Sequence, residues 1–121
     1  MSGRLVFVVE DDPDGNDLLC EILRRAGYEA VGATNGRQAL ERLQQGLAPA
    51  VLLLDLMMPI LNGWQLIDEI KKLPALASMP IVVLSADAGL AQTARSLGAA
   101  GWLRKPASME SVLEAVAVHV K

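Results

Sequence analysis

The chain has 121 residues, 52% of them hydrophobic and 21% charged, which is the size and composition of one compact globular domain rather than of a disordered segment. Its net charge of -3, with no run of Lys or Arg, argues against direct binding of nucleic acid. The longest apolar stretch, residues 50–61, is interrupted by Asp55 and Pro59 and is shorter than the roughly 20 residues that a membrane span needs, so we expect no membrane segment.

Two residue types that often build functional sites occur only once. Cys20 is the only cysteine, which excludes an internal disulfide. His119 is the only histidine, so neither a histidine metal site nor a Ser-His-Asp triad is expected. No apolar signal region precedes the first apolar run. Together with the lone cysteine, this predicts a cytoplasmic protein.

Five short apolar runs predict β-strands. The runs at residues 5–9 and 51–54 do not alternate with polar residues, which is typical of strands covered on both faces. Pro59 prevents the second of these from continuing far. The remaining expected strands are residues 29–33, 81–84 and 101–103.

A helical pattern follows each expected strand. Polar residues that cap helix N-termini begin four of these segments, and glycines end three of them. The expected caps are Asp12 before Pro13, Asn35, Asn62 and Ser108, and the expected stops are Gly27, Gly46 and Gly98. A weaker, alanine-rich helix is expected over residues 88–97. In the last helix, one inward face is predicted to carry Met109, Val112, Leu113, Val116 and Val120.

The order of the elements predicts the fold class. Strands and helices alternate five times with short connections, which indicates an α/β fold with a parallel sheet and helices on both faces. No linker, low-complexity tract or other change of composition marks a boundary, so we expect residues 1–121 to form one domain.

Polar residues follow the buried strands at the points where these strands end. They are Glu10 and Asp11, Asp55, Ser85 and Lys105. Because the carboxyl ends of parallel strands share one edge of a sheet, we expect these side chains to meet in one site.

The chemistry of this set points to a metal ion and to phosphorus. Three carboxylates brought together repel one another unless a cation holds them, and oxygen ligands without His or Cys favour a hard ion such as Mg²⁺. With a metal present, Asp55 could attack a phosphoryl group, while Lys105 neutralises the developing charge and Ser85 donates a hydrogen bond.

Each of these residues also has an ordinary structural interpretation. Glu10 and Asp11 could complement a helix dipole, Asp55 and Ser85 could be turn residues, and Lys105 could be a solvated surface side chain. Taken jointly, these interpretations would require four unrelated features to fall on the same edge of one sheet. The joint pattern therefore favours a site.

Over residues 4–120 the chain resembles the receiver domains of two-component response regulators, the chemotaxis (CheY-like) type of single-domain fold. Four motifs carry the resemblance: Val-Val-Glu-Asp-Asp at 8–12, Leu-Asp-Leu-Met-Met-Pro-Ile-Leu-Asn-Gly at 54–63, Leu-Ser-Ala at 84–86 and Gly-Trp-Leu-Arg-Lys-Pro at 101–106. The resemblance implies a doubly wound, flavodoxin-like (βα)5 domain whose five parallel strands lie in the order 2-1-3-4-5.

The resemblance also implies roles for particular residues. Asp55 would accept a phosphoryl group. Asp11 and Asp55 would bind Mg²⁺ directly, with the Met57 backbone carbonyl as a third ligand and Glu10 acting mainly through water. Lys105 would pair with the acceptor or its phosphoryl group, and the bond to Pro106 would be cis. Ser85 and Trp102 would form the switch pair, although Trp102 is bulkier than the more usual Tyr or Phe.

For partners, the resemblance implies a sensor histidine kinase or histidine phosphotransfer protein as donor and a downstream target protein as output. Donor specificity would lie in exposed first-helix residues near 14–17. Ala115 and Val118 offer a small apolar surface on the last helix, which hints at partner docking or at a dimer formed on phosphorylation. The apolar Met57 should slow hydrolysis of the phosphorylated form, which we expect to last minutes or longer.

The protein is not expected to be an enzyme beyond catalysing its own phosphorylation and dephosphorylation. One alternative is a Mg²⁺-dependent phosphohydrolase, but such enzymes generally carry an acid two residues after the nucleophile, where this chain has Met57. Another is a receiver-like binding module that works without phosphorylation. A dinucleotide-binding domain is disfavoured because no glycine-rich phosphate loop is present.

Overall fold

The computed structural model describes residues 4–58 and 60–120. Its five strands are β1 (Leu5–Val9), β2 (Glu29–Ala33), β3 (Val51–Asp55), β4 (Ile81–Ser85) and β5 (Gly101–Arg104). Its helices are α1 (Pro13–Arg25), α2 (Gly36–Gln44), α3 (Gly63–Lys71), α4 (Leu90–Leu97) and α5 (Met109–His119), with a short 3-10 turn, η2 (Pro74–Leu76), before β4. Strands and helices alternate along the chain as predicted.

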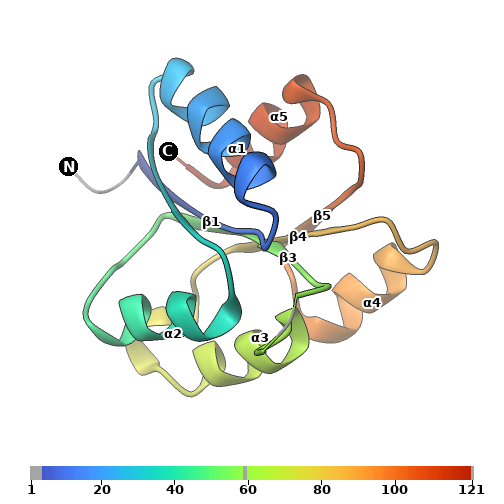
Figure 1. The fold of residues 1–121 in the computed structure, drawn as a ribbon. Helices are drawn as coiled ribbons and strands as arrows, with labels where there is room; N and C mark the ends of the chain where they lie inside the picture. The colour runs from blue at the N-terminus through green and yellow to red at the C-terminus, as the bar shows by residue number, and fades with distance from the viewer. Residues whose placement is uncertain (1–3, 59, 121) are drawn as a thin grey trace.

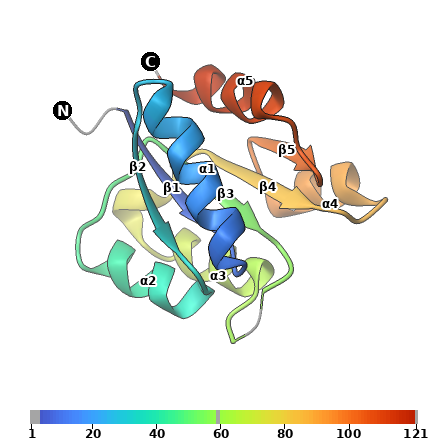
Figure 2. The same cartoon turned by 45° about the horizontal axis from the view of Figure 1, so that its top comes forward.

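The strands form one sheet in the order β2-β1-β3-β4-β5, and every neighbouring pair is parallel. All the strands therefore run in the same direction and their carboxyl ends meet at one edge (Figure 2). The predicted fold class and strand order are confirmed. The polar residues that follow the strands belong to this edge.

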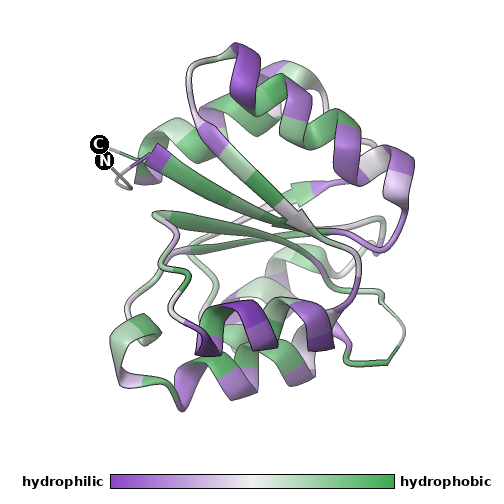
Figure 3. Ribbon diagram, turned by 60° about the vertical axis from the view of Figure 1, so that its left-hand side comes forward, coloured by the Kyte–Doolittle hydropathy of each residue, from purple (hydrophilic) through white to green (hydrophobic). Residues whose placement is uncertain are grey.

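Two helical layers cover the sheet, α1 and α5 on one face and α2, α3 and α4 on the other (Figure 1). Each layer has its own apolar core. Phe7 and Leu54 pack toward α2, α3 and α4, whereas Val8 and Leu53 pack toward α1 and α5. Apolar strands lie between helices whose outer faces are hydrophilic (Figure 3). The unbroken apolar runs of β1 and β3 are explained by this burial on both faces, since all five residues of each strand are buried.

The predicted helix caps are present. The side chains of Asp12, Asn35, Asn62 and Ser108 each accept a hydrogen bond from a backbone N–H in the first turn of their helix. At α3 the Asn62 backbone N–H in turn donates to the Gln65 side chain, which completes a capping box. By contrast, α4 begins at Leu90, later than predicted, and has no side-chain cap.

Two expectations for the last helix were wrong. Met109 is 57% exposed, so it does not belong to the inward face that Val112 and Val116 form. Ala115 was expected on the outer surface but packs against the core between the sheet, α1 and α5. Helical periodicity identified the buried positions Val112 and Val116 but not the limits of the buried face.

The connection from β3 to α3 carries an unusual backbone conformation. Ile60 has a φ of 71° and a side chain that is 70% exposed. A β-branched residue at positive φ is strained, because its side chain crowds its own backbone. The turn predicted at Pro59 lies outside the described residues.

Among the described residues, no helix has the length and apolar character that crossing a membrane requires.

Candidate phosphoryl-transfer site

Four strand ends bring the candidate site residues to one edge of the sheet. Glu10 follows β1, Asp55 ends β3, Ser85 ends β4 and Lys105 follows β5. β1 and β3 are neighbours in the sheet, as are β3 and β4, so these residues come together although the sequence separates them widely.

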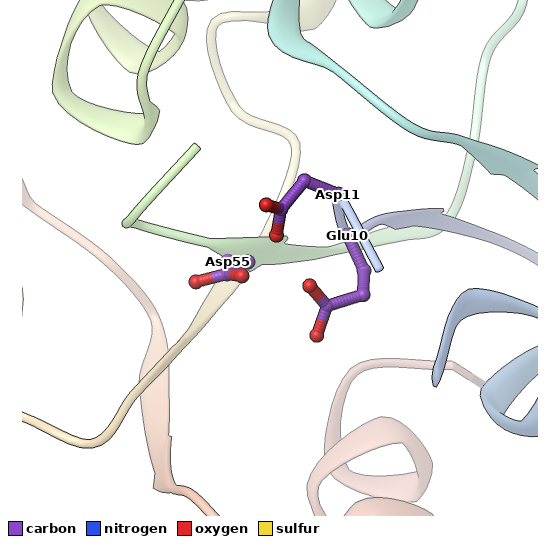
Figure 4. Close-up of side chains that lie close together, drawn as sticks. All are labelled: Glu10, Asp11 and Asp55. Carbon is purple, nitrogen blue, oxygen red and sulfur yellow. The ribbon is translucent and has the colours of Figure 1, made fainter. Parts of the chain in front are cut away.

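The three acids form a compact cluster. Glu10, Asp11 and Asp55 each contribute a carboxylate oxygen, and these oxygens lie within 4.8 Å of one another. Their side chains project into the same space beyond the ends of β1 and β3 (Figure 4). Glu10 and Asp55 are only 5% and 3% exposed, whereas Asp11 is not buried. The cluster can therefore admit an ion from the Asp11 side.

Lys105 holds two of these acids. Its Nζ lies 2.6 Å from Glu10 Oε1 and 3.0 Å from Asp55 Oδ2, and 34% of its side chain is exposed. Partial burial acts to lower the Lys105 pKa, but the hydrogen bonds and negative charges of Glu10 and Asp55 outweigh it, so the pKa is raised. The ammonium therefore stays charged at neutral pH.

Backbone N–H groups orient the same carboxylates. Asp55 Oδ1 accepts a 3.0 Å hydrogen bond from the Met57 N–H, and Glu10 Oε2 accepts one of 3.3 Å from the Asp12 N–H. Asp55 thus has one oxygen bonded to a neutral donor and the other to a cation. The carboxylate is held in place before any ligand arrives.

Of the predicted switch pair, Ser85 ends β4, the strand next to β3 and Asp55, and Trp102 lies in β5. Ser85 is 3% exposed, and its hydroxyl oxygen accepts a bond from the Asp87 N–H at 3.1 Å. The Lys105 N–H donates to the Ser85 carbonyl at 3.0 Å, which ties the ends of β4 and β5 together. Trp102 is 40% exposed, and the Arg95 guanidinium lies over its ring, 5.4 Å from the ring centroid. The aromatic ring therefore lies on the side of β5 that faces α4.

The peptide bond between Lys105 and Pro106 is cis, as predicted. The Met57 side chain is 66% exposed, and its role as a screen for the site stays a prediction. Cys20 is buried, and burial raises the pKa of its thiol, which agrees with an unreactive cysteine.

Our sequence analysis missed Asn16. Its side chain is 4% exposed, and its amide donates to backbone carbonyls at the ends of β1 and β2. The helical spacing of Asn16, Cys20 and Leu23 could have indicated it, because this spacing puts all three residues on the inward side of α1.

A family model described as the response regulator receiver domain matches residues 6–117, which is nearly the whole chain. The chain belongs to this family. It is 33% identical over 115 residues to the chemotaxis protein CheY of Thermotoga maritima, a match that covers 94% of this chain and 95% of CheY. Other curated relatives are longer regulators, of which the chain spans about half the length.

Solved structures agree with this assignment. The chemotaxis protein CheY4 of Vibrio cholerae superimposes with a TM-score of 0.88 at 27% identity, covering 96% of this chain and 98% of CheY4. The receiver domain of the sensor histidine kinase PA1611 of Pseudomonas aeruginosa, solved with a magnesium ion in its active-site cleft, shares the fold with a TM-score of 0.87 at 24% identity and 98% coverage of both chains. The protein is thus a receiver domain of the kind found in two-component response regulators, whose receivers take phosphoryl groups from histidine kinases.

Proposed function

We propose that Asp55 is the phosphoryl acceptor of this receiver domain. The observation that carries the proposal is the bridge from Lys105 to both Glu10 and Asp55 inside the acidic cluster. A buried carboxylate that is held by a lysine and a backbone N–H faces a donor in a fixed orientation. The phosphoryl group passes from a histidine nitrogen to an Asp55 oxygen, so the N–P bond breaks as the O–P bond forms.

Mg²⁺ is the metal that the acidic cluster suits. Glu10, Asp11 and Asp55 offer only oxygen ligands, which a hard divalent cation prefers over softer metals. Asp11 and Asp55 would bind the ion directly, with the Met57 carbonyl as a further ligand and Glu10 acting through water. When bound, the ion neutralises charge on the phosphoryl oxygens.

The remaining polar residues would act after transfer. The Lys105 ammonium can leave Asp55 for the phosphoryl oxygens, because its pair with Glu10 keeps it at the site. The Ser85 hydroxyl can donate to the same oxygens, which would draw the β4–α4 connection toward Asp55. With Ser85 displaced, Trp102 is the residue whose rotation would alter the surface formed by α4, β5 and α5.

The donor would be a sensor histidine kinase or a histidine phosphotransfer protein, and the output would be contact with a target protein. The exposed side chain of Val118, 70% accessible on α5, is a candidate for that contact. A dimer formed on phosphorylation stays a prediction. The lone buried cysteine supports a reducing cytoplasm as the location.

Intact mass after incubation with acetyl phosphate tests the proposal. We expect one added phosphoryl group on the wild type with Mg²⁺, none without Mg²⁺, and none on Asp55→Asn. An adduct on Asp55→Asn would assign the acceptor to another residue. If the wild type neither gains mass nor binds beryllofluoride, the chain has a receiver fold that works without phosphorylation.

A separate assay, the release of phosphate from a small phosphoester, tests the alternative of a phosphohydrolase. An enzyme of that class would release many phosphates per chain from a small phosphoester, whereas a receiver turns over only its own acyl phosphate. No acid is available at position 57 to protonate a leaving group, since Met57 occupies it. We therefore propose that the protein is not an enzyme in the ordinary sense.

A further inference from the structure

Asn16 is a buried polar side chain for which the proposed phosphoryl transfer has no direct use. It lies in the first turns of α1, is 4% exposed, and faces the ends of β1 and β2. Burying an amide costs free energy unless its hydrogen bonds are made. The bonds that Asn16 makes therefore indicate why an amide is present there.

The Asn16 side chain joins three backbone carbonyls. Its Nδ2 lies 2.8 Å from the Ala33 carbonyl, 3.1 Å from that of Glu10 and 3.3 Å from that of Val8. An amide nitrogen has two hydrogens, so one of these bonds is shared between two acceptors. The Glu10 N–H also donates to the Ala33 carbonyl, at 3.1 Å. Both backbone polar groups of Glu10 are thus restrained.

The other end of the amide is held as well. Asn16 Oδ1 accepts a bond from the Cys20 thiol, with 3.6 Å between oxygen and sulfur. It rests over Gly32, where a Cβ atom would lie 2.0 Å from Oδ1. Gly32 therefore leaves the space that the Asn16 side chain occupies, and the Cys20 thiol gives the amide oxygen a weak donor.

The carbonyl of Glu10 belongs to the peptide group that links Glu10 to Asp11. Fixing this peptide fixes the position of the Asp11 Cα relative to Glu10 and so limits the directions that the Asp11 side chain can take. These two acids supply two of the three carboxylates of the cluster. The Asn16 backbone N–H donates to the carbonyl of Asp12, the N-cap of α1, at 2.9 Å, which is the first intrahelical bond of α1.

We propose that Asn16 is a positioning residue for the metal site: its amide holds the Glu10–Asp11 peptide in the orientation that lets both acids face a bound Mg²⁺. The inference rests on the proposed function, because it assumes that the acidic cluster binds Mg²⁺. A metal site weakens when the groups that orient its ligands are removed, typically by 10-fold or more. The bonds of Asn16 to the backbone place it in that role.

The test measures Mg²⁺ binding apart from activity. The thermal unfolding midpoint is recorded as MgCl2 is raised, and the dissociation constant follows from the increase in stability. We expect Asn16→Ala and Asn16→Leu each to lower the affinity for Mg²⁺ by about 10-fold. Asn16→Leu is included because it fills the space while making none of the hydrogen bonds. At saturating Mg²⁺, both variants should recover most of the wild-type rate of phosphorylation by acetyl phosphate.

Cys20→Ala is the matched control. It truncates a buried side chain on the same side of α1 but leaves the three carbonyl bonds of Asn16 in place. We expect it to lower the unfolding midpoint while keeping the wild-type Mg²⁺ affinity. If either Asn16 variant binds Mg²⁺ as tightly as the wild type, Asn16 has only a structural role and the inference is overturned. If the wild type itself gains no stability from Mg²⁺, the proposed metal site fails instead.

Discussion

Met57 lies two residues after Asp55, donates its backbone N–H to the Asp55 carboxylate at 3.0 Å, and leaves its side chain 66% exposed. Its backbone and its side chain therefore do different work. The backbone N–H orients the Asp55 carboxylate, and any residue other than proline could supply that bond. We expect the side chain to screen an acyl phosphate on Asp55 from water, so its chemistry should govern the lifetime of the phosphorylated form.

We expect Met57→Asn to lose its phosphoryl group about tenfold faster than the wild type, a change of about 1.4 kcal/mol in the barrier. The asparagine amide can form hydrogen bonds that orient an attacking water, whereas the Met57 thioether is only a weak acceptor. The decay of the phosphorylated mass after removal of acetyl phosphate measures this. Met57→Leu, which keeps an apolar side chain, should decay like the wild type. Equal or slower decay in Met57→Asn would contradict the role of Met57 as a screen.

At the scale of elements, the start of α2 and the β3–α3 connection are in close contact. Gly36 begins α2, and a Cβ atom there would lie 2.0 Å from the Leu61 carbonyl oxygen. The connection carries Met57 at one end and the Asn62 cap of α3 at the other. Only a glycine lets α2 approach this backbone so closely, so the contact helps to hold the loop beside Asp55.

Gly36→Ala should destabilise the fold by about 1–3 kcal/mol, because either the Leu61 carbonyl or the first turn of α2 must move. Urea unfolding monitored by circular dichroism measures the change. Gly89→Ala is the control, since nothing lies within 4 Å of a Cβ atom built at Gly89. We expect a change there of no more than about 0.5 kcal/mol. Similar losses of unfolding free energy in the two variants would show that the backbone around Gly36 accommodates a Cβ atom at little cost.

At the scale of the whole molecule, the surface beside the site is apolar. A pocket of about 460 Å³ runs from Lys105 past Ala107 to Leu18, and a second of about 390 Å³ continues from Leu18 to Met109. Leu18 and Met109 are 59% and 57% exposed. If Asp55 is the acceptor, as proposed, a donor protein whose histidine transfers to it has to cover the surface next to the site. We therefore expect α1 and the start of α5 to form its docking surface.

Leu18→Asp should slow transfer from a histidine-phosphorylated donor protein by at least about tenfold, since it buries a charge in an apolar contact. Phosphorylation by acetyl phosphate, which needs no docking, should be unchanged. The assay takes the histidine kinases and phosphotransfer proteins of the source organism in turn and follows the fastest donor. Val118→Asp is the control, because it places the same charge at an exposed apolar residue outside both pockets. Unchanged transfer to Leu18→Asp would place docking elsewhere.

Much of this architecture could be predicted from local sequence. Unbroken apolar runs identified β1 and β3, and polar caps located the starts of α1, α2, α3 and α5. The position of Glu10, Asp11, Asp55, Ser85 and Lys105 at strand ends followed from the same patterns. These features depend on residues close together in the chain, where hydrophobic periodicity and backbone chemistry act directly. The residue roles assigned by resemblance stay predictions.

The tertiary structure decided what depends on distant pairs. Lys105 bridges Glu10 as well as Asp55, and the Asn16 amide turns inward because Gly32 on the neighbouring strand leaves it room. Met109, the first residue of α5, is 57% exposed although its spacing matches that of the buried Val112 and Val116. The sequence by itself determined which groups stand at the edge of the sheet. Which of them touch was set by the packing of helices and strands, since no local pattern encodes the partner of a side chain.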